Sequence, residues 1–332
     1  MRKMKRLYFV LLALCVCISV LSVSGVAFAL AQMDEQPLYE AVSNVTFHIR
    51  KTPEDNGRRL KEVESHKSLL VYEYGEQWCK VQYDNALGYC KTKWLYRYRS
   101  LQPEKAYVPG YPAQEGFARV TSPVHATVSG YGGNDLLPGN LLSVHQWNDK
   151  EATIHMMRST AAIGADGLIF TPFVPWKDAQ TGDAIGGFTT YYNEKTGGKL
   201  SKNRQWNIEL ACRRVHGTVI PAGEAFSYNT LCAPYKKANE YKMAPNISDD
   251  GQGYGGGVCQ LTTTVYNAVL GLPLKIEEWS IHRDSGVPYI PKGFDAAVGS
   301  YSDFVFQNTL PYAIQLAALP QNGVLTVLIY RH

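Results

Sequence analysis

The residues with the clearest chemical potential lie in segment 253–274, GYGGGVCQLTTTVYNAVLGLPL. Three glycines precede Cys259, and apolar residues then recur at three- and four-residue steps. This pattern predicts a helix with one buried face that begins near the cysteine and ends at Pro273. A thiol at a helix N-terminus feels the positive end of the helix dipole, which favours the nucleophilic thiolate. The pattern therefore predicts a nucleophilic cysteine, with a small buried packing residue as the alternative.

The glycine run predicts backbone donors beside this thiol. Because glycine has no side chain, a substrate can approach its backbone closely. We expect the N–H groups of Gly256, Gly257 and Val258, and that of Cys259 itself, to point at the oxygen that becomes negative during acyl transfer. A nucleophile with preorganised donors beside it is the arrangement that acyl transfer requires.

Acyl transfer also needs a base, and His282 is the candidate. It follows Cys259 in the chain within IHRDSGVPYIP, and a Cys–His pair can share a site when the fold brings the two together. Tyr289, Asp295 or Glu277 could orient the imidazole, although each is more often a structural residue. An unrelated His282 at the surface is the alternative.

Further elements must position this pair. GGFTTYY at residues 186–192 is typical of a strand, and the segment after it predicts a helix that is capped by Ser201 or Asn203 and stops at Gly217. Near the C-terminus, two alternating runs flank the Gln-Asn-Gly turn at 321–323, which is a strong β-hairpin signal. The whole chain therefore predicts a multidomain, β-rich (α+β) protein with a helix opening at the cysteine.

Segment 186–332 resembles the VanW family. The shared elements, in order, are GFTTY at 187–191, Arg204, Asn207 with Ile208, PAGEAFS at 221–227, GGGVCQL at 255–261, His282, Asp295 with Ala296, and Asp303 with Phe304. The sequence departs from the family around the histidine: Glu277 and Glu278 stand where the family has Glu-Arg, and Arg283 stands where it has Ser. The histidine itself is retained.

Some members of this family are implicated as cysteine L,D-transpeptidases of peptidoglycan. The resemblance implies that Cys259 attacks the third residue of a stem peptide, that His282 protonates the leaving D-alanine, and that an amine from another stem resolves the thioester. Two other classes stay open. One is a non-catalytic peptidoglycan-binding or accessory protein linked to glycopeptide resistance. The other is a cysteine peptidase or amidase of the wall.

Arginine is the natural receptor for a substrate carboxylate, because its guanidinium binds that group bidentately. Arg204 is preferred to Arg283, since Arg283 breaks the family pattern. The residues expected to contact the substrate are Arg204, Tyr289, Asp295 and Gln260. No metal or cofactor is expected, because His145 and His155 lack a metal-ligand spacing.

Residues 38–98 predict a small β-barrel, since strand-sized alternating runs are broken there by turn residues. Their order resembles a bacterial SH3-like domain. The matching features are RKTP at 50–53, WCKV at 78–81, Gly88 with Tyr89, and Trp94 with Leu95. The resemblance implies a module that recognises wall peptides or glycans, with a plain spacer as the alternative. Residues 99–185, with scattered prolines and glycines, predict a linker or an intermediate module.

The N-terminus predicts export. Residues 1–29 combine basic residues, an apolar run and a final Ala-Phe-Ala, which is typical of a cleaved signal peptide. The alternative is an uncleaved membrane anchor, which would be the protein's one membrane contact. Removing the leader with its four basic residues leaves 29 Lys and Arg against 29 Asp and Glu. A neutral protein in the cell envelope is a poor candidate for nucleic-acid binding.

Cysteine pairs tend to oxidise outside the cytoplasm. If the residues at 84–85 form a two-residue turn, Cys79 faces Cys90 on the neighbouring strand, which predicts a disulfide. Cys212 and Cys232 could form a second pair. Cys259 then remains as a free thiol.

Overall fold

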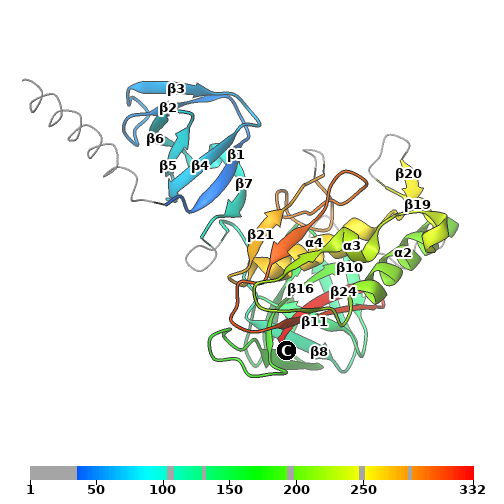
Figure 1. Ribbon diagram of the computed structural model, residues 1–332. Coiled ribbons are helices and arrows are strands. Elements are labelled where there is room, and N and C mark those ends of the chain that lie inside the picture. The colour runs from blue at the N-terminus through cyan, green and yellow to red at the C-terminus, as the bar shows by residue number, and fades with distance from the viewer. Residues whose placement is uncertain (1–35, 103–107, 129–131, 193–197, 247–250, 283–285) are drawn as a thin grey trace, which may run out of the picture.

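The structure is a computed structural model that describes residues 36–102, 108–128, 132–192, 198–246, 251–282 and 286–332 (Figure 1). The expected leader and Arg283 lie outside these ranges. Strands dominate the described chain, as expected. Its α-helices within these ranges are α2 (Lys199–Val215), α3 (Tyr228–Cys232) and α4 (Val258–Leu270). None of the described helices has the length and apolar character needed to cross a membrane.

The N-terminal part is one antiparallel sheet of seven strands in the order β3-β2-β6-β5-β4-β1-β7. The strands are β1 (Tyr39–Ser43), β2 (Phe47–Arg50), β3 (Arg59–Val63), β4 (Ser68–Glu73), β5 (Trp78–Tyr83), β6 (Ala86–Lys91) and β7 (Leu95–Ser100). In the described chain no pairing joins β3 to β7, so the sheet is not a closed barrel and that prediction is corrected. Four of the five residues of β3 are exposed, which leaves this strand little apolar surface with which to close the sheet.

Cys79 and Cys90 lie directly opposite each other on β5 and β6, so the predicted register is confirmed. Both thiols are nevertheless free, and the expected disulfide is not formed. The N–H of Thr92 donates to the carbonyl of Gln77 at 3.0 Å. Because bonded and non-bonded pairs alternate along an antiparallel ladder, the cysteines also form a bonded pair, in which side chains lie farther apart.

Residues 116–172, which we call the intermediate module, form short strands around an apolar core that also includes Tyr191 and Val324 of the C-terminal part. The strands are β8 (Gly116–Val120), β9 (Val124–Val128), β10 (Gly132–Leu136), β11 (Leu141–Val144), β12 (Gln146–Trp147), β13 (Glu151–Met156), β14 (Ser159–Gly164) and β15 (Leu168–Pro172). The module packs on the C-terminal sheet: the N–H of Ser143 donates to Thr189 Oγ1 at 2.7 Å, and Thr326 Oγ1 donates to the Leu141 carbonyl at 2.5 Å.

The C-terminal part contains a four-stranded sheet in the order β16-β24-β23-β17 and two smaller sheets. The strands are β16 (Ala184–Tyr191), β17 (Val219–Ile220), β18 (Ala225–Ser227), β19 (Met243–Pro245), β20 (Gln252–Tyr254), β21 (Lys275–Glu278), β22 (Val305–Gln307), β23 (Ile314–Gln321) and β24 (Val324–Arg331). The predicted terminal hairpin is confirmed. Asn322 and Gly323 form its turn, and both have the positive φ that a two-residue hairpin turn requires.

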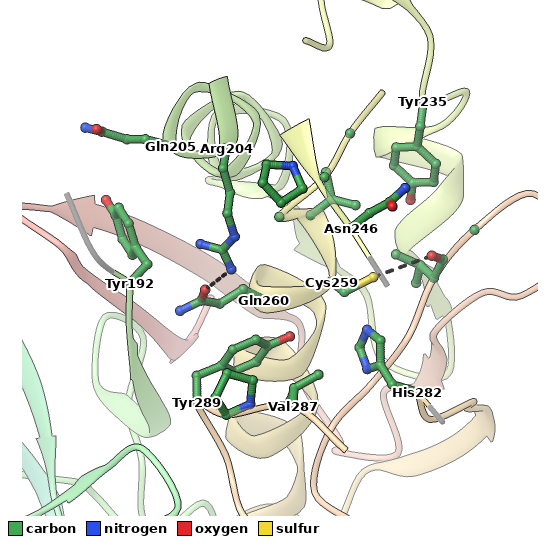
Figure 2. A pocket seen from close by; sticks show the side chains of 18 of the residues that line it. Tyr192, Arg204, Gln205, Tyr235, Asn246, Cys259, Gln260, His282, Val287 and Tyr289 are labelled. Carbon is green, nitrogen blue, oxygen red and sulfur yellow. Dashed lines mark hydrogen bonds between the residues drawn. The ribbon is translucent and has the colours of Figure 1, made fainter. Parts of the chain in front are cut away.

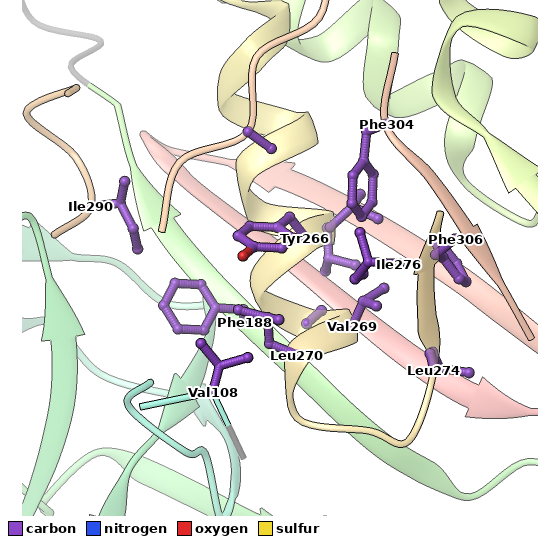
Figure 3. Packing of buried hydrophobic residues seen from close by; sticks show 14 of the residues in the cluster. Val108, Phe188, Tyr266, Val269, Leu270, Leu274, Ile276, Ile290, Phe304 and Phe306 are labelled. Atoms are coloured by element: carbon purple, nitrogen blue, oxygen red, sulfur yellow. The ribbon is translucent and has the colours of Figure 1, made fainter. Parts of the chain in front are cut away.

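Helix α4 begins one residue before Cys259 and ends before Pro273, as predicted. Twelve of its thirteen residues are buried, so the expected single buried face is in fact a helix covered on all sides. Figure 3 shows Tyr266 and Val269 of this helix among Phe188, Phe304 and neighbouring side chains. Each buried apolar side chain of this size contributes about 1.5–3 kcal/mol, so the helix is a fixed platform for its first turn.

Helix α2 begins earlier than predicted, at the N-cap Gly198, so Ser201 and Asn203 lie inside the helix and do not cap it. The reason is that Lys199 and Leu200 are good helix formers and extend the helix towards the glycine.

Cys212 on α2 and Cys232 on α3 are buried free thiols, so the second expected disulfide is not formed. Among the described cysteines this leaves Cys259 as the one that is not buried.

Candidate active site

Cys259 is the one residue of α4 that is not buried, and it opens on a cavity of about 760 Å³. Figure 2 shows its sulfur near the centre of the site, with Arg204 on one side and His282 on the other. The thiol donates to the carbonyl of Val298 at 3.5 Å. The sulfur is therefore reachable from solvent and lies in the first turn of a rigid helix, where the dipole favours negative charge.

The glycine run places the start of α4 against its neighbours. A Cβ at Gly256 would lie 2.4 Å from the carbonyl oxygen of Pro245, and one at Gly257 would lie 2.8 Å from Arg204 Cγ. Gly257, the N-cap of α4, also has φ 107°, which side chains rarely adopt. The glycines are thus required for packing against β19 and α2, and this was not foreseen from the sequence.

Only some of the backbone N–H groups that we expected to bind an oxyanion are available. The N–H of Val258 donates to the Gly255 carbonyl at 3.0 Å, and that of Gly256 points at the Gly253 carbonyl at 3.4 Å. These two donors are therefore engaged in the turn that starts the helix, which corrects the expectation for Gly256 and Val258. For the N–H groups of Gly257 and Cys259 we find no acceptor in the described ranges, so these two can face an oxyanion.

His282 faces Cys259 and is held from behind by Asp295. The carboxylate Oδ2 of Asp295 lies 2.7 Å from His282 Nδ1 and accepts the His282 backbone N–H at 2.8 Å. The Asp295 side chain is fully buried, and that of His282 is 9% exposed. Asp295 therefore orients the imidazole, the role left open for it, and does not line the cavity as a substrate contact.

Charge at His282 follows from its surroundings. Burial lowers the pKa of the imidazole, but the hydrogen bond with Asp295 and the interaction with the Cys259 sulfur outweigh it and raise this pKa to about 9. This raised pKa favours the cationic form of His282 at neutral pH. The thiol and the cation lie next to each other, which is the arrangement that activates cysteine nucleophiles.

Two polar side chains of α4, together with Trp279 outside the helix, hold the loop that carries Asp295. The Thr263 hydroxyl accepts the Ala296 N–H at 3.0 Å and donates to the Ala296 carbonyl at 3.2 Å. Asn267 donates to the Phe294 carbonyl at 2.7 Å, and Trp279 Nε1 donates to the Asp295 carbonyl at 2.9 Å. Sequence reasoning missed these residues. Their signal was polarity: threonines and an asparagine inside a helix with an apolar core.

Arg204 enters the cavity from α2 and carries no ion pair with any described residue. Its Nη2 donates to Gln260 Oε1 at 2.7 Å, and Gln260 Nε2 in turn donates to the Tyr191 carbonyl at 2.9 Å. Burial lowers the pKa of Arg204, yet arginine stays charged. A half-buried cation that lines a cavity and has no carboxylate partner among the described residues fits an anionic group of a ligand. Gln260, expected to bind substrate, lines the cavity and also positions Arg204, so its contact with substrate stays a prediction.

The remaining expected residues are placed as follows. Tyr289 lines the cavity, and burial together with the nearby Cys259 sulfur raises its pKa. Glu277 lies on exposed β21 and pairs with Lys275 at 2.7 Å, away from the cavity lining. No group of side chains that could hold a metal ion occurs among the residues with described positions.

Comparison with known proteins bears on this site. The family profile described as "VanW like protein" matches residues 203–330. This segment is a VanW-like domain. It contains Arg204, Cys259, His282 and Asp295. The family match does not extend to residues 36–202, so the SH3-like nature of the N-terminal sheet stays a prediction.

Two curated relatives share the similarity. The "Uncharacterized protein YoaR" of Bacillus subtilis (strain 168) is 34% identical over 149 residues, which cover 44% of this chain and 47% of YoaR. The "Vancomycin B-type resistance protein VanW" of Enterococcus faecalis (strain ATCC 700802 / V583) is 30% identical over 95 residues, 27% of this chain and 34% of the relative. The chain therefore spans less than half of either relative.

Among solved structures, an NlpC/P60 family protein from Bacillus cereus ATCC 10987 aligns over 88% of this chain and 94% of its own, with 11% identity and a TM-score of 0.17. A score this low does not bear on the fold.

Proposed function

We propose that this protein is an exported cell-envelope enzyme that transfers acyl groups of peptidoglycan stem peptides through Cys259, as a cysteine L,D-transpeptidase. The observation that carries the proposal is the row formed by Cys259, His282 and buried Asp295, in which the first two line the cavity. The raised pKa of His282 supports it. A relative named as a vancomycin resistance protein supports a role at the cell wall. The leader expected at residues 1–29 fits the same location.

In the first half-reaction, the Cys259 thiolate attacks the carbonyl carbon of the third stem residue. The carbonyl oxygen becomes negative and is stabilised by the N–H groups of Gly257 and Cys259. Protonated His282 then gives its proton to the leaving nitrogen, so the C–N bond breaks and D-alanine departs as an amine. The acyl group remains on Cys259 as a thioester, and His282 is neutral.

In the second half-reaction, an amine of another stem attacks the thioester carbonyl. Neutral His282 takes the proton of that amine, the C–S bond breaks and the thiolate is regenerated. The product is a cross-link between two stems. Water in place of the amine would instead release a free carboxylate, so the same residues could serve a wall peptidase or amidase.

Arg204 supports a substrate with a carboxylate close to the scissile bond. Its guanidinium reaches into the cavity and has no acidic partner in the described part of the chain. The terminal carboxylate of the departing D-alanine fits this position, because it lies one residue from the attacked carbonyl. The proposal therefore favours cleavage at the end of a stem over cleavage within one.

The rival is a non-catalytic wall-binding protein, in which the N-terminal sheet or the cavity binds peptidoglycan without turnover. Alkylation of the native protein by iodoacetamide, followed by peptide mapping, separates the two. We expect rapid labelling at Cys259, because the other described cysteines are buried. Protection of Cys259 until the protein unfolds would favour the binding protein.

Product analysis separates the two chemistries. Stem tetrapeptides incubated with the protein should give a cross-linked dimer for transpeptidation and a free tripeptide for hydrolysis, both detected by mass spectrometry. The Cys259→Ala variant should give neither while retaining the thermal unfolding transition. Turnover by this variant would overturn the proposal.

A further inference from the structure

Part of the cavity lining comes from outside the VanW-like domain. The turn of the β13–β14 hairpin, in the intermediate module, places Met157 in the cavity lining beside residues of the cysteine and histidine segments. Met157 also packs against two apolar cores of the described chain: the core of the intermediate module, and the larger core that contains residues of the N-terminal sheet and of the C-terminal part. The hairpin therefore joins the two parts at the active site.

The turn is fixed by a buried histidine that takes no part in the chemistry. Met157 has φ 55°, which is uncommon for a side chain of this kind. His155 is 3% exposed, and its Nε2 lies 2.8 Å from the Met157 carbonyl. Burial lowers the pKa of His155 to about 4 in spite of this bond, so the ring is neutral near pH 7 and donates Nε2–H to the carbonyl. The hydrogen bond from the buried His155 ring thus fixes the backbone that orients Met157.

The same hairpin also holds the segment that follows His282. Arg158 Nε donates to the carbonyl of Val287 at 2.9 Å, and Val287 and Pro288 line the cavity. Figure 2 shows Val287 between Tyr289 and His282, across the site from Arg204. Met157, Val287, Pro288 and Val298 all belong to the cavity lining, and we call these four apolar residues the apolar wall.

We propose that Met157, supported by His155 and Arg158, is a specificity-determining residue that packs against an aliphatic side chain on the residue whose carbonyl Cys259 attacks. This inference rests on the proposed function. A carboxylate at Arg204 places the leaving residue on that side of Cys259, so the acyl residue extends towards the apolar wall. Methionine suits such a wall, because its flexible thioether adapts to side chains of different shape. Arg158 acts as a positioning residue through Val287.

The test compares synthetic tetrapeptides that share their other residues and carry norleucine or alanine at the residue that donates the carbonyl. We expect the wild-type protein to prefer norleucine in kcat/KM by roughly tenfold, the scale on which apolar pockets distinguish side-chain length. The Met157→Ala variant should lose most of this preference, and Met157→Leu should keep it. Ile169→Ala, an exposed apolar residue on β15 of the same module, is the matched control and should behave as wild type.

A second readout does not depend on turnover. N-hexyl iodoacetamide and iodoacetamide alkylate Cys259 by the same chemistry, and the hexyl chain probes the wall. After normalisation to a free thiol, the wild-type protein should favour the hexyl reagent, and Met157→Ala should remove that advantage while iodoacetamide reacts as before. Arg158→Ala should reduce it, and Arg158→Lys should restore it in part.

The outcomes separate the two proposals. If a folded Met157→Ala protein loses both the preference for norleucine and the preference for the hexyl reagent, the role of Met157 in the apolar wall is supported. If that variant keeps both preferences, the proposed role of Met157 is wrong, even if Cys259 turns over peptides. The protein could instead show a hexyl preference that depends on Met157 and yet turn over no stem peptide. That result would support the role of Met157 in the apolar wall and overturn the proposed function.

Discussion

His282 balances two opposing effects at the scale of single residues. Burial alone would favour a neutral imidazole, yet the carboxylate of Asp295 and the sulfur of Cys259 favour the cation. That Cys259 and His282 lie together could be predicted from the sequence, because their types are distinctive and the glycine run marks the cysteine; their roles as nucleophile and base stay predictions. The role of Asp295 was left open, since residue spacing cannot tell whether a carboxylate lies behind a histidine or in front of it.

The raised pKa of His282 predicts a dependence of stability on pH. An unfolded histidine has a pKa near 6.5, and His282 in the folded protein has one of about 9. Its contribution to folding, on the order of 1–3 kcal/mol, should therefore be complete below pH 6.5 and disappear as the pH rises through about 9. Urea unfolding of wild type and His282→Gln should show a stability difference that shrinks between pH 6 and 9.5. A constant or growing difference would contradict it.

Asp295→Asn should impair catalysis more than folding. The amide keeps the shape of the carboxylate but removes the charge that favours cationic His282, so kcat/KM should fall roughly 10²- to 10⁴-fold, the cost seen when such orienting carboxylates are changed. The pH profile of Cys259 alkylation should also shift. Asp303→Asn is the control: that carboxylate accepts the Ser227 hydroxyl at 2.6 Å away from the cavity, and its loss should leave the alkylation profile unchanged.

Helix α4 is the element that builds the site. Its first turn carries Cys259, and its second holds the loop with Asp295 through Thr263. The bounds of this helix and the C-terminal hairpin were predictable because their turn residues are explicit: Pro273 after the helix, and Asn322 with Gly323 between the strands. Burial of the helix on all sides was not predictable, because threonine is polar. Thr263 instead binds the loop at Ala296, and the Thr264 hydroxyl lies 2.8 Å from that of Thr190 on β16.

Thr263→Val should therefore loosen the site through the loop. The change conserves shape but leaves the N–H and carbonyl of Ala296 without their partner, which should cost roughly 1–3 kcal/mol of stability and lower the acyl-transfer rate. The neighbouring Thr262→Val variant is the control, since the Thr262 hydroxyl donates only weakly, at 3.4 Å, to the Val258 carbonyl within the same helix. Equal losses in the two variants, measured by thermal unfolding and turnover, would remove the special role of Thr263.

At the scale of the whole molecule, the candidate site depends on two parts of the chain. The intermediate module supplies Met157, and the C-terminal part supplies the rest, including loop residues such as His282 and Tyr289. This dependence could not be predicted, because the strands of residues 116–172 are short and partly paired out of order, as β8 with β15. The open N-terminal sheet differs from the expected barrel for a related reason. Closure depends on whether the first and last edges meet, which alternation along single strands does not reveal.

The docking of the intermediate module predicts how fragments behave. A fragment of residues 186–332 would expose Thr189 and Thr326, which form part of the interface between the module and the sheet, and would lose the partners that Ser143 and Leu141 provide. Buried strand faces without cover do not give a stable fold in water, so this fragment should lack a cooperative thermal transition and should bind a hydrophobic dye. A fragment of residues 108–332 keeps the module and the bond from the Tyr111 hydroxyl to the Asn267 carbonyl, at 2.5 Å, and should unfold in one transition with Cys259 still reactive to iodoacetamide. Cooperative unfolding of both fragments at the same temperature would show that the VanW-like domain folds without the module.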